Sequence, residues 1–169
     1  MVQKQDCLLE NNFQVFLVGG AVRDWFLKKD CKDYDIATNA EPDQVQKLFR
    51  KTIPTGIEHG TVTILYKGEQ IECTTFRCEA DYSDGRHPNA LNYVKTIEED
   101  LARRDFTINA MAYNEEEGIV DLYNGQKDIE NKVINFVGNA EERIIEDPLR
   151  VLRAFRFMSR LKFSLSENT

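Results

Sequence analysis

The feature that most constrains this chain is a glycine turn followed closely by a pair of aspartates. The turn is Gly19-Gly20, and the pair is Asp33 and Asp35. Glycine lets backbone N–H groups approach an anion without a Cβ in the way, and a helix that begins there favours negative charge. In an extended segment alternate side chains share a face, so the two carboxylates would point the same way. The spacing predicts a phosphate-binding turn beside a metal site.

Two carboxylates side by side suit Mg²⁺, which prefers oxygen ligands and completes its shell with water and substrate phosphate. Each motif alone has a plainer interpretation, namely a strand-to-helix turn for the glycines and a solvated loop for the aspartates. Because the two motifs occur so close together, we interpret them as parts of one site.

The composition is that of an ordinary globular protein. The chain has 169 residues, of which 41% are hydrophobic and 30% charged, enough for one core or for one core and the start of a second. No stretch is long and apolar enough to span a bilayer, and the first residues lack the apolar core of a signal peptide. We therefore expect a cytoplasmic protein with no membrane partner. The cysteines match no zinc spacing.

The net charge of −7 argues against non-specific binding of nucleic acid over the whole surface. The segment from Arg143 to Phe163 differs, because its basic residues outnumber its acidic ones. Any surface that faces phosphate should include that end of the chain.

The pattern of apolar residues predicts an α/β (α+β) fold on a small mixed sheet. We expect strands over 13–18, 33–37, 61–66 and 70–76, the last two forming a hairpin. We also expect short strands near 119–121 and 133–136, joined by a turn at 123–126, and a long polar loop over 77–93. Helices are expected over 6–12, from Gly20, from Pro42, over 97–104, and from Ala140 to the end.

A third carboxylate is a candidate for the catalytic site. Glu72 lies in an apolar, β-branched strand, where a charge is costly unless it is paired or bound to metal. Two-metal transfer of phosphoryl or nucleotidyl groups often uses such a carboxylate. The alternative is that Glu72 lies on the solvent face of a hairpin strand.

The segment 103–111 is a second candidate for phosphate binding. Arginine offers bidentate geometry to phosphate oxygens, so Arg104 can bind a nucleotide. Asp105 can orient an arginine, and Asn109 can bond a sugar hydroxyl or a backbone group. The alternative is an exposed helix end with ordinary salt bridges.

The segment 146–157 predicts a helix with an arginine stripe. At about 100° per residue, Arg150, Arg153 and Arg156 share one side. Asp147 and Arg150 can present an acceptor and a donor to the edge of a base, or form a simple salt bridge. The helix would be attached through the opposite, apolar side, formed by Val151, Leu152, Phe155 and Met158.

The same segments occur in the order of the motifs of a known family. The chain resembles the N-terminal part of class II tRNA nucleotidyltransferases, the CCA-adding enzymes, within the polymerase-β-type nucleotidyltransferase superfamily. The resemblance is carried by residues 19–24 with 33–35, 59–62, 72–77, 103–111 and 146–154.

This resemblance implies a nucleotidyltransferase head at residues 1–138, with a mainly antiparallel sheet flanked by helices, and the start of a helical neck at 139–169. It implies that Asp33 and Asp35 hold two catalytic Mg²⁺ ions and that the 3′-hydroxyl of tRNA attacks the α-phosphate of CTP or ATP. It also implies nucleotide contacts: Gly20 and Arg23 to the triphosphate, Arg104 and Asp105 to the sugar or phosphates, and Asp147 and Arg150 to the base, with Arg153 and Arg156 in support.

The sequence is also compatible with other functions. A bacterial poly(A) polymerase shares most of these motifs, although the sequence from His59 to Val62 looks more like the tRNA enzymes. An enzyme adding only A is an alternative; one adding only CC is less expected, because the region 77–93 is not shortened. A non-catalytic nucleotide-binding module is a further alternative. Family members continue into body and tail regions that hold tRNA, so we expect a chain ending at Thr169 to bind nucleotide but to add to tRNA poorly.

Overall fold

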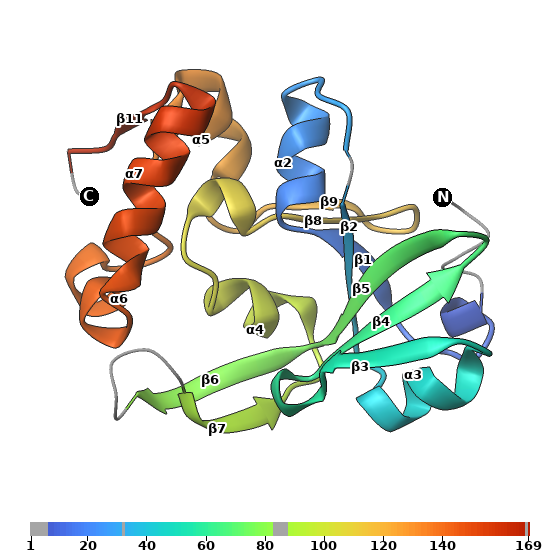
Figure 1. Cartoon of the computed structure of the whole chain (residues 1–169). Coiled ribbons are helices and arrows are strands. Elements are labelled where there is room, and N and C mark those ends of the chain that lie inside the picture. Colours follow the sequence, from blue (N-terminus) through green and yellow to red (C-terminus); the bar gives the residue numbers. More distant parts are fainter. Residues whose placement is uncertain (1–6, 32, 83–87, 168) are drawn as a thin grey trace.

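The computed structural model describes residues 7–31, 33–82, 88–167 and 169, without the side chains of 79–82 and 88–91. Its centre is a seven-stranded sheet in the order β3-β4-β5-β2-β1-β8-β9 (Figure 1). All neighbouring strands are antiparallel except β2 and β5, which run parallel. The sheet is therefore mixed and mainly antiparallel, as expected. Its strands are β1 (Val15–Val18), β2 (Tyr34–Thr38), β3 (Thr52–Gly56), β4 (Thr61–Tyr66), β5 (Glu69–Thr75), β8 (Ala112–Asn114) and β9 (Gly118–Val120).

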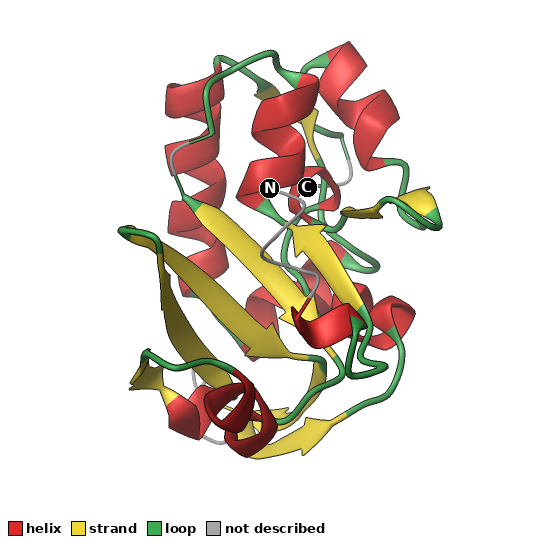
Figure 2. Cartoon of the chain, turned by 90° about the vertical axis from the view of Figure 1, so that its right-hand side faces the viewer, coloured by secondary structure: helices red, strands yellow, loops and turns green. Residues whose placement is uncertain are grey.

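Helices flank this sheet at both ends. The C-terminal helices α6 and α7 lie together at one end and α3 at the other, and the view turned by 90° shows most helices gathered on one side of the strands (Figures 1 and 2). No helix in the described part of the chain is long and apolar enough to cross a membrane. The helices are α2 (Gly20–Phe26), α3 (Pro42–Leu48), α4 (Ile97–Ala102), α5 (Gly125–Asn131), α6 (Ala140–Glu146) and α7 (Leu149–Leu161), with 3₁₀ turns η1 (Ile57–His59) and η2 (Thr107–Asn109).

The largest hydrophobic cluster joins the sheet to the C-terminal helix. Leu17 of β1 and the fully buried Phe106 and Met111 belong to one cluster with Ala154 and Leu161 of α7. A second cluster fills the space between the sheet and α3. Because the first cluster contains residues from both sides of position 138, α7 is held directly against the part of the fold that carries the predicted site.

The segment 77–93 differs from the expected loop. It contains a separate antiparallel hairpin of β6 (Arg77–Tyr82) and β7 (Pro88–Tyr93), while residues 83–87 lie outside the described residues. The expectation was wrong because backbone hydrogen bonds alone can pair two polar segments, without the apolar alternation by which strands are recognised.

Three further elements depart from the expected order. The strand β3 was not predicted, because it contains Pro54, a residue confined to edge strands and bulges, and β3 is an edge strand with a register shift. The turn expected at 123–126 runs into helix α5. The chain after α7 is not helical to the end, because β11 (Ser164–Leu165) pairs in parallel with β10 (Val133–Ile134).

The side chain of Asp121 caps the first turn of helix α5, which was not predicted. The two oxygens of the Asp121 carboxylate accept hydrogen bonds from the backbone N–H groups of Gly125 (2.8 Å) and Gln126 (3.0 Å). These bonds satisfy two donors that the first turn of a helix leaves without a partner. The residues 123–126 are typical of a turn. The signal that favoured a helix was Asp121, whose capping carboxylate lies four residues before Gly125.

We expect Gly125→Ala to destabilise the protein by about 1–3 kcal/mol, because there is no room for a Cβ. An added Cβ would lie 2.4 Å from the carbonyl oxygen of Thr107 and 2.9 Å from the side chain of Met111. Urea unfolding measures the effect. Gly56→Ala is the matched control, since its Cβ would lie 3.4 Å from Thr61; equal stabilities of the two variants would contradict the close packing of α5 on η2.

Candidate nucleotide and metal site

Three carboxylates meet at one edge of the parallel strand pair. Asp35 on β2 is the register partner of Glu72 on β5, and Glu72 is in turn the partner of Thr63 on β4, so their side chains share one face. Asp33 precedes Asp35 by two residues and lines the same cavity of about 340 Å³. The structure thus brings together the three residues that the sequence analysis selected, and their catalytic roles stay predictions.

The electrostatics of this cavity favour a cation. Burial, and after it the nearby Glu72 and Asp33, raise the pKa of Asp35 to about 6 against the opposing effect of Arg104. Carboxylates that repel one another in this way are stabilised by a divalent ion, and oxygen donors suit Mg²⁺. No group of three or more histidine, cysteine or acidic side chains in the described ranges is arranged to hold a metal by itself. The carboxylates of Asp33, Asp35 and Glu72 fit an ion that takes its other ligands from water and nucleotide phosphate.

The predicted glycine turn lies beside an arginine. Gly19 has a φ of 64° and precedes the first residue of α2, Gly20. The positive φ of Gly19 favours glycine, and a Cβ there would lie 3.0 Å from Nη1 of Arg104, which would have to shift slightly. The turn and Arg104, selected separately from the sequence, are neighbours in the structure.

A buried aspartate that the sequence analysis missed holds Arg104 in this position. Asp100 on α4 is fully buried and accepts hydrogen bonds from Nη2 of Arg104 (3.0 Å), from Nε of Arg103 (3.0 Å) and from the backbone N–H of Arg77 (3.3 Å). Burial raises the pKa of Asp100, but Arg104 and Arg103 outweigh it and leave the pKa below its ordinary value. The spacing of Asp100 to two arginines, three and four residues later, was the signal that could have identified it.

A chain of polar contacts connects α2 to α7 through the predicted site residues. Arg23 donates from Nη1 to Oδ1 of Asn109 (2.6 Å), and Asn109 donates from Nδ2 to Oδ1 of Asp105 (3.4 Å). Asp105 in turn forms an ion pair with Arg153 (Nη2 to Oδ2, 2.7 Å). Arg23, Asn109 and Asp105 are buried, so each has a partner inside the protein. Their contacts with a nucleotide stay predictions.

The arginine helix faces differently from the expectation. Leu152 and Phe155 are 65% and 55% exposed, so they do not form the attached side. Ala154 and Leu161 are buried there instead, while Phe157 lies against the Phe106 ring (5.6 Å between centroids). The prediction was wrong for Leu152 and Phe155 because α7 has apolar residues on two sides, whereas Met158 packs partly buried against the core cluster as expected.

The predicted base-reading residues lie at the start of α7. Arg150 is buried and donates from Nη1 to Glu146 (2.5 Å) and to the carbonyl of Arg143 (2.9 Å). The carboxylate of Asp147 accepts a hydrogen bond from the backbone N–H of Leu149 (3.0 Å), at the first turn of the helix. Arg153 and Arg156 are exposed. Arg150 is therefore buried, whereas the other two arginines of the expected stripe are exposed.

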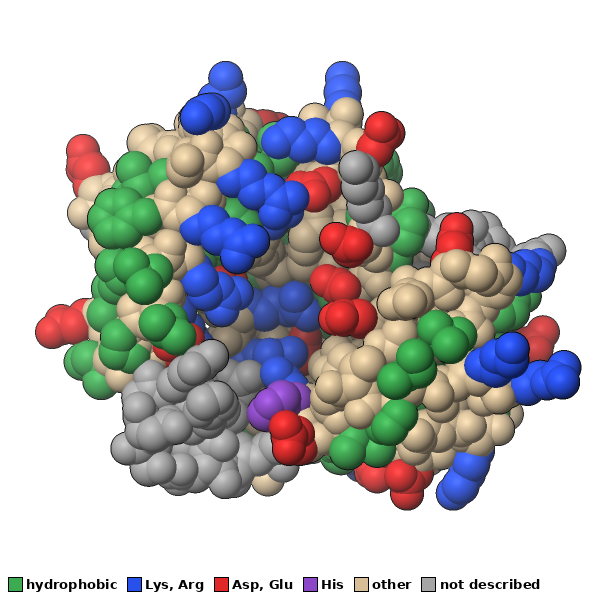
Figure 3. Space-filling view, viewed as in Figure 1, with side chains coloured by type: hydrophobic (Ala, Val, Ile, Leu, Met, Phe, Trp, Pro, Cys, Tyr) green, Lys and Arg blue, Asp and Glu red, His purple; other side chains and the backbone are tan. Residues whose placement is uncertain are grey.

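The space-filling view shows how these groups are arranged. Basic side chains gather along a hollow over α7 and α2, and acidic side chains stand opposite them over the sheet (Figure 3). Such an arrangement presents cations on one side of the hollow and carboxylates on the other, which suits a ligand that carries both phosphates and a divalent ion.

Comparisons with known proteins agree with this geometry. Residues 15–135 match the sequence profile of the poly A polymerase head domain. The chain is 51% identical over 162 residues to the CCA-adding enzyme of Bacillus subtilis (strain 168) and 52% identical over 162 residues to that of Lactobacillus delbrueckii subsp. bulgaricus. Each alignment covers 96% of this chain and 41% of the relative.

Solved structures give the same result. The structure of the Bacillus stearothermophilus CCA-adding enzyme in complex with CTP has a TM-score of 0.89 and 42% identity, over 97% of this chain and 39% of that one. A tRNA nucleotidyltransferase complexed with a primer tRNA and an incoming ATP analog has a TM-score of 0.75 and 34% identity, over 100% of this chain and 47% of that one. The chain spans about two fifths of the length of the CCA-adding relatives. The chain belongs to the family of the poly A polymerase head domain, the nucleotidyltransferase head that CCA-adding enzymes share.

Proposed function

We propose that this chain is the catalytic head of a CCA-adding enzyme, a template-independent tRNA nucleotidyltransferase that adds CMP and AMP from CTP and ATP to the 3′ end of tRNA. The observation that supports this most directly is the register of β2 and β5, which places Asp35 next to Glu72, together with the approach of Arg104 to the Gly19-Gly20 turn. Sequence identity of about half to CCA-adding enzymes supports the same substrates.

In this proposal Asp33 and Asp35 hold two Mg²⁺ ions. When bound, the metal would lower the pKa of the attacking 3′-hydroxyl and neutralise charge on the leaving pyrophosphate. Glu72 supplies the third carboxylate, and Arg104 together with the Gly19-Gly20 turn binds the triphosphate. These side chains position the reacting oxygens in line. Their charges and dipoles are already oriented toward the reacting atoms before the reaction begins.

We assign the choice between nucleotide bases to residues at the start of α7. Asp147 would accept from the exocyclic amine of cytosine or adenine, and Arg150 would donate to a ring nitrogen or carbonyl. The bonds of Arg150 to Glu146 and to the carbonyl of Arg143 fix its guanidinium group at the start of α7. Arg153 and Arg156 would support the nucleotide from the next turns of the helix.

The proposal also assigns residues 1–138 to the head and 139–169 to the start of the neck, in a cytoplasmic protein. A poly(A) polymerase is the second candidate, because the matching profile is named for that enzyme. An enzyme that adds only A is a related alternative. A non-catalytic module has less support, because a binding module does not need paired carboxylates.

The experiment that tests the proposal measures incorporation of labelled nucleotides into tRNA that lacks its 3′ end. We expect slow incorporation of CMP and AMP with Mg²⁺, and none from GTP or UTP. Long tails made from ATP alone would identify a poly(A) polymerase, and a single AMP on tRNA ending in CC would identify an A-adding enzyme. Binding of CTP without any transfer would favour the non-catalytic module. Titration of the chain with CTP, followed calorimetrically, tests nucleotide binding separately from tRNA addition.

We expect Asp147→Ala to remove the preference for CTP and ATP over GTP and UTP, because the acceptor for the exocyclic amine is lost. Alanine also removes the bond to the backbone N–H of Leu149. Asp147→Asn is the matched control, since its amide oxygen can still accept that bond while the carboxylate is gone. Competition between the four nucleotides for binding measures selectivity; full selectivity in the alanine variant would contradict the assignment of base reading to Asp147.

A further inference from the structure

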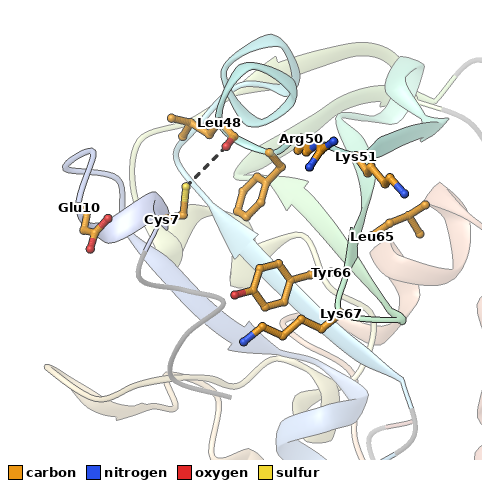
Figure 4. A pocket seen from close by; sticks show the side chains of 9 residues that line it. Cys7, Glu10, Leu48, Arg50, Lys51, Leu65, Tyr66 and Lys67 are labelled. Atoms are coloured by element: carbon orange, nitrogen blue, oxygen red, sulfur yellow. Dashed lines mark hydrogen bonds between the residues drawn. The ribbon is translucent and has the colours of Figure 1, made fainter.

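A second pocket lies at the end of the fold that carries α3. It has a volume of about 560 Å³ and lies between the end of α3, the segment that follows it and the β4–β5 turn (Figure 4). We name it the α3 pocket. The lining residues that matter here are Phe49, Arg50, Lys51, Tyr66 and Lys67.

The α3 pocket is separate from the carboxylate site. Along β4, Thr63 faces the cavity of Asp35 and Glu72, whereas Val62 and Ile64 point to the other side, into the cluster that contains Val45 of α3. Tyr66 continues that second row and packs partly buried against the same cluster. The α3 pocket shares no lining residue with the cavity of Asp35 and Glu72, and its Tyr66 lies on the opposite face of the β4–β5 hairpin.

The charge of the α3 pocket is opposite to that of the chain. Arg50, Lys51 and Lys67 are all exposed and face only Glu10 among the lining acidic residues, in a protein of net charge −7. Within the described part of the chain, Arg50 and Lys51 have no ion-pair partner. A local group of cations on an acidic protein attracts an anionic ligand.

Aromatic rings accompany these cations. The rings of Phe49 and Tyr66 are packed partly buried against the core, which fixes their positions. In Figure 4, Tyr66 lies between Arg50 and Lys51 on one side and Lys67 on the other, and the Lys67 ammonium is 5.2 Å from the Tyr66 ring centroid. A fixed aromatic ring between cations is the arrangement by which proteins bind single-stranded nucleic acid without reading its sequence.

We propose that the α3 pocket binds single-stranded RNA, with one base against Phe49 and Tyr66 and the phosphates on either side of it bound by Arg50 with Lys51 and by Lys67. A base within a strand has a phosphate on each side, whereas a free nucleotide carries all its phosphates on one side. The placement of cations on two sides of Tyr66 therefore favours a strand. The site goes beyond nucleotide addition, since it requires no metal and no transfer.

The test measures binding of a fluorescein-labelled twelve-nucleotide oligo(A) whose 3′ end is blocked by phosphate, followed by anisotropy at several salt concentrations. We expect the double variant Arg50→Glu with Lys51→Glu to weaken binding about tenfold or more and to reduce the salt slope by about 1, because phosphate contacts are lost. The matched control is Lys29→Glu with Lys127→Glu, which makes the same charge change at exposed positions outside the pocket. It should bind within about twofold of the parent.

Two further arms identify what is bound. An abasic strand of the same length should bind about fivefold more weakly or worse, because stacking on the rings is lost. A strand containing 5-bromouridine should cross-link to the peptides of Phe49 or Tyr66. Equal losses in both double variants, or cross-links only outside the α3 pocket, would overturn the proposal. AMP that binds as tightly as the strand, and is lost in the pocket variant, would replace RNA by a free nucleotide and would also overturn it. None of these measurements depends on nucleotide addition. The RNA-binding proposal can therefore fail while the proposed activity holds, and the reverse.

Discussion

Asp35→Asn is expected to reduce nucleotide addition by about 10³-fold or more, to the background of the assay. Asp35 is the half-buried carboxylate between Asp33 and Glu72, and its loss removes a ligand from the proposed metal site. Metal stabilisation of the transition state is worth several kcal/mol, and each 1.36 kcal/mol is a factor of ten in rate. Single-turnover addition of CMP at saturating Mg²⁺ measures the loss. Activity close to that of the parent would contradict the assignment of Asp35 to the metal.

The same variant is expected to be more stable than the parent when metal is absent. The pKa of Asp35 rises from 3.8 to about 6 on folding, first through burial and then through Glu72. Between these values the folded state binds a proton that the unfolded state does not, so stability falls as the pH rises through this window. Asparagine carries no charge and avoids that loss. We expect a gain of about 1–2 kcal/mol at pH 7.5, a value reduced for solvent screening, and no difference below about pH 4.

Urea unfolding in EDTA between pH 4 and 7.5 measures this difference. The control is Asp33→Asn, which removes an exposed carboxylate from the same cavity and should change stability less. A variant at Asp35 that is both inactive and less stable at pH 7.5 would mean that the substitution damages the fold, and the metal assignment would lose its support.

Asp100→Ala is expected to destabilise the protein by about 3–5 kcal/mol. The substitution removes a fully buried carboxylate and leaves the guanidinium groups of Arg103 and Arg104 without their shared partner. Because the pKa of Asp100 is lowered in the folded state, its contribution is present above about pH 4 and is lost as the pH falls through the folded pKa. The difference from the parent should therefore shrink in acid.

Denaturant unfolding and CTP titration together test the role of Asp100. Affinity for CTP should fall as well, since Arg104 loses the contact that holds it beside Gly19. Glu98→Ala is the control, because Glu98 is an exposed acidic residue on the same helix and its removal should change stability by no more than about 0.5 kcal/mol. Equal stabilities of the two variants would show that the buried ion pairs contribute little.

Much of the fold follows from local patterns. The strands β1, β2, β4 and β5 and the starts of α2 and α3 were predicted close to their observed positions, because apolar periodicity and turn residues act over short distances. The strand β3 and the β6–β7 hairpin were not, since each depends on pairing with another strand, which for β3 is β4. Helix α5 was also missed, although its capping residue Asp121 lies only four residues before Gly125.

The sequence by itself determined the types and order of the site residues: the glycine turn, the paired aspartates, and the arginines of the two later motifs. The tertiary structure decided which of them are neighbours. Asp35 lies beside Glu72 only because β2 and β5 pair in parallel and in one register. Asp100 turns inward to hold Arg104, and α7 packs through Ala154 while Leu152 stays exposed. The physical reason is that residue types follow from the chain, whereas strand register and the buried face of a helix depend on the whole core that packs against them.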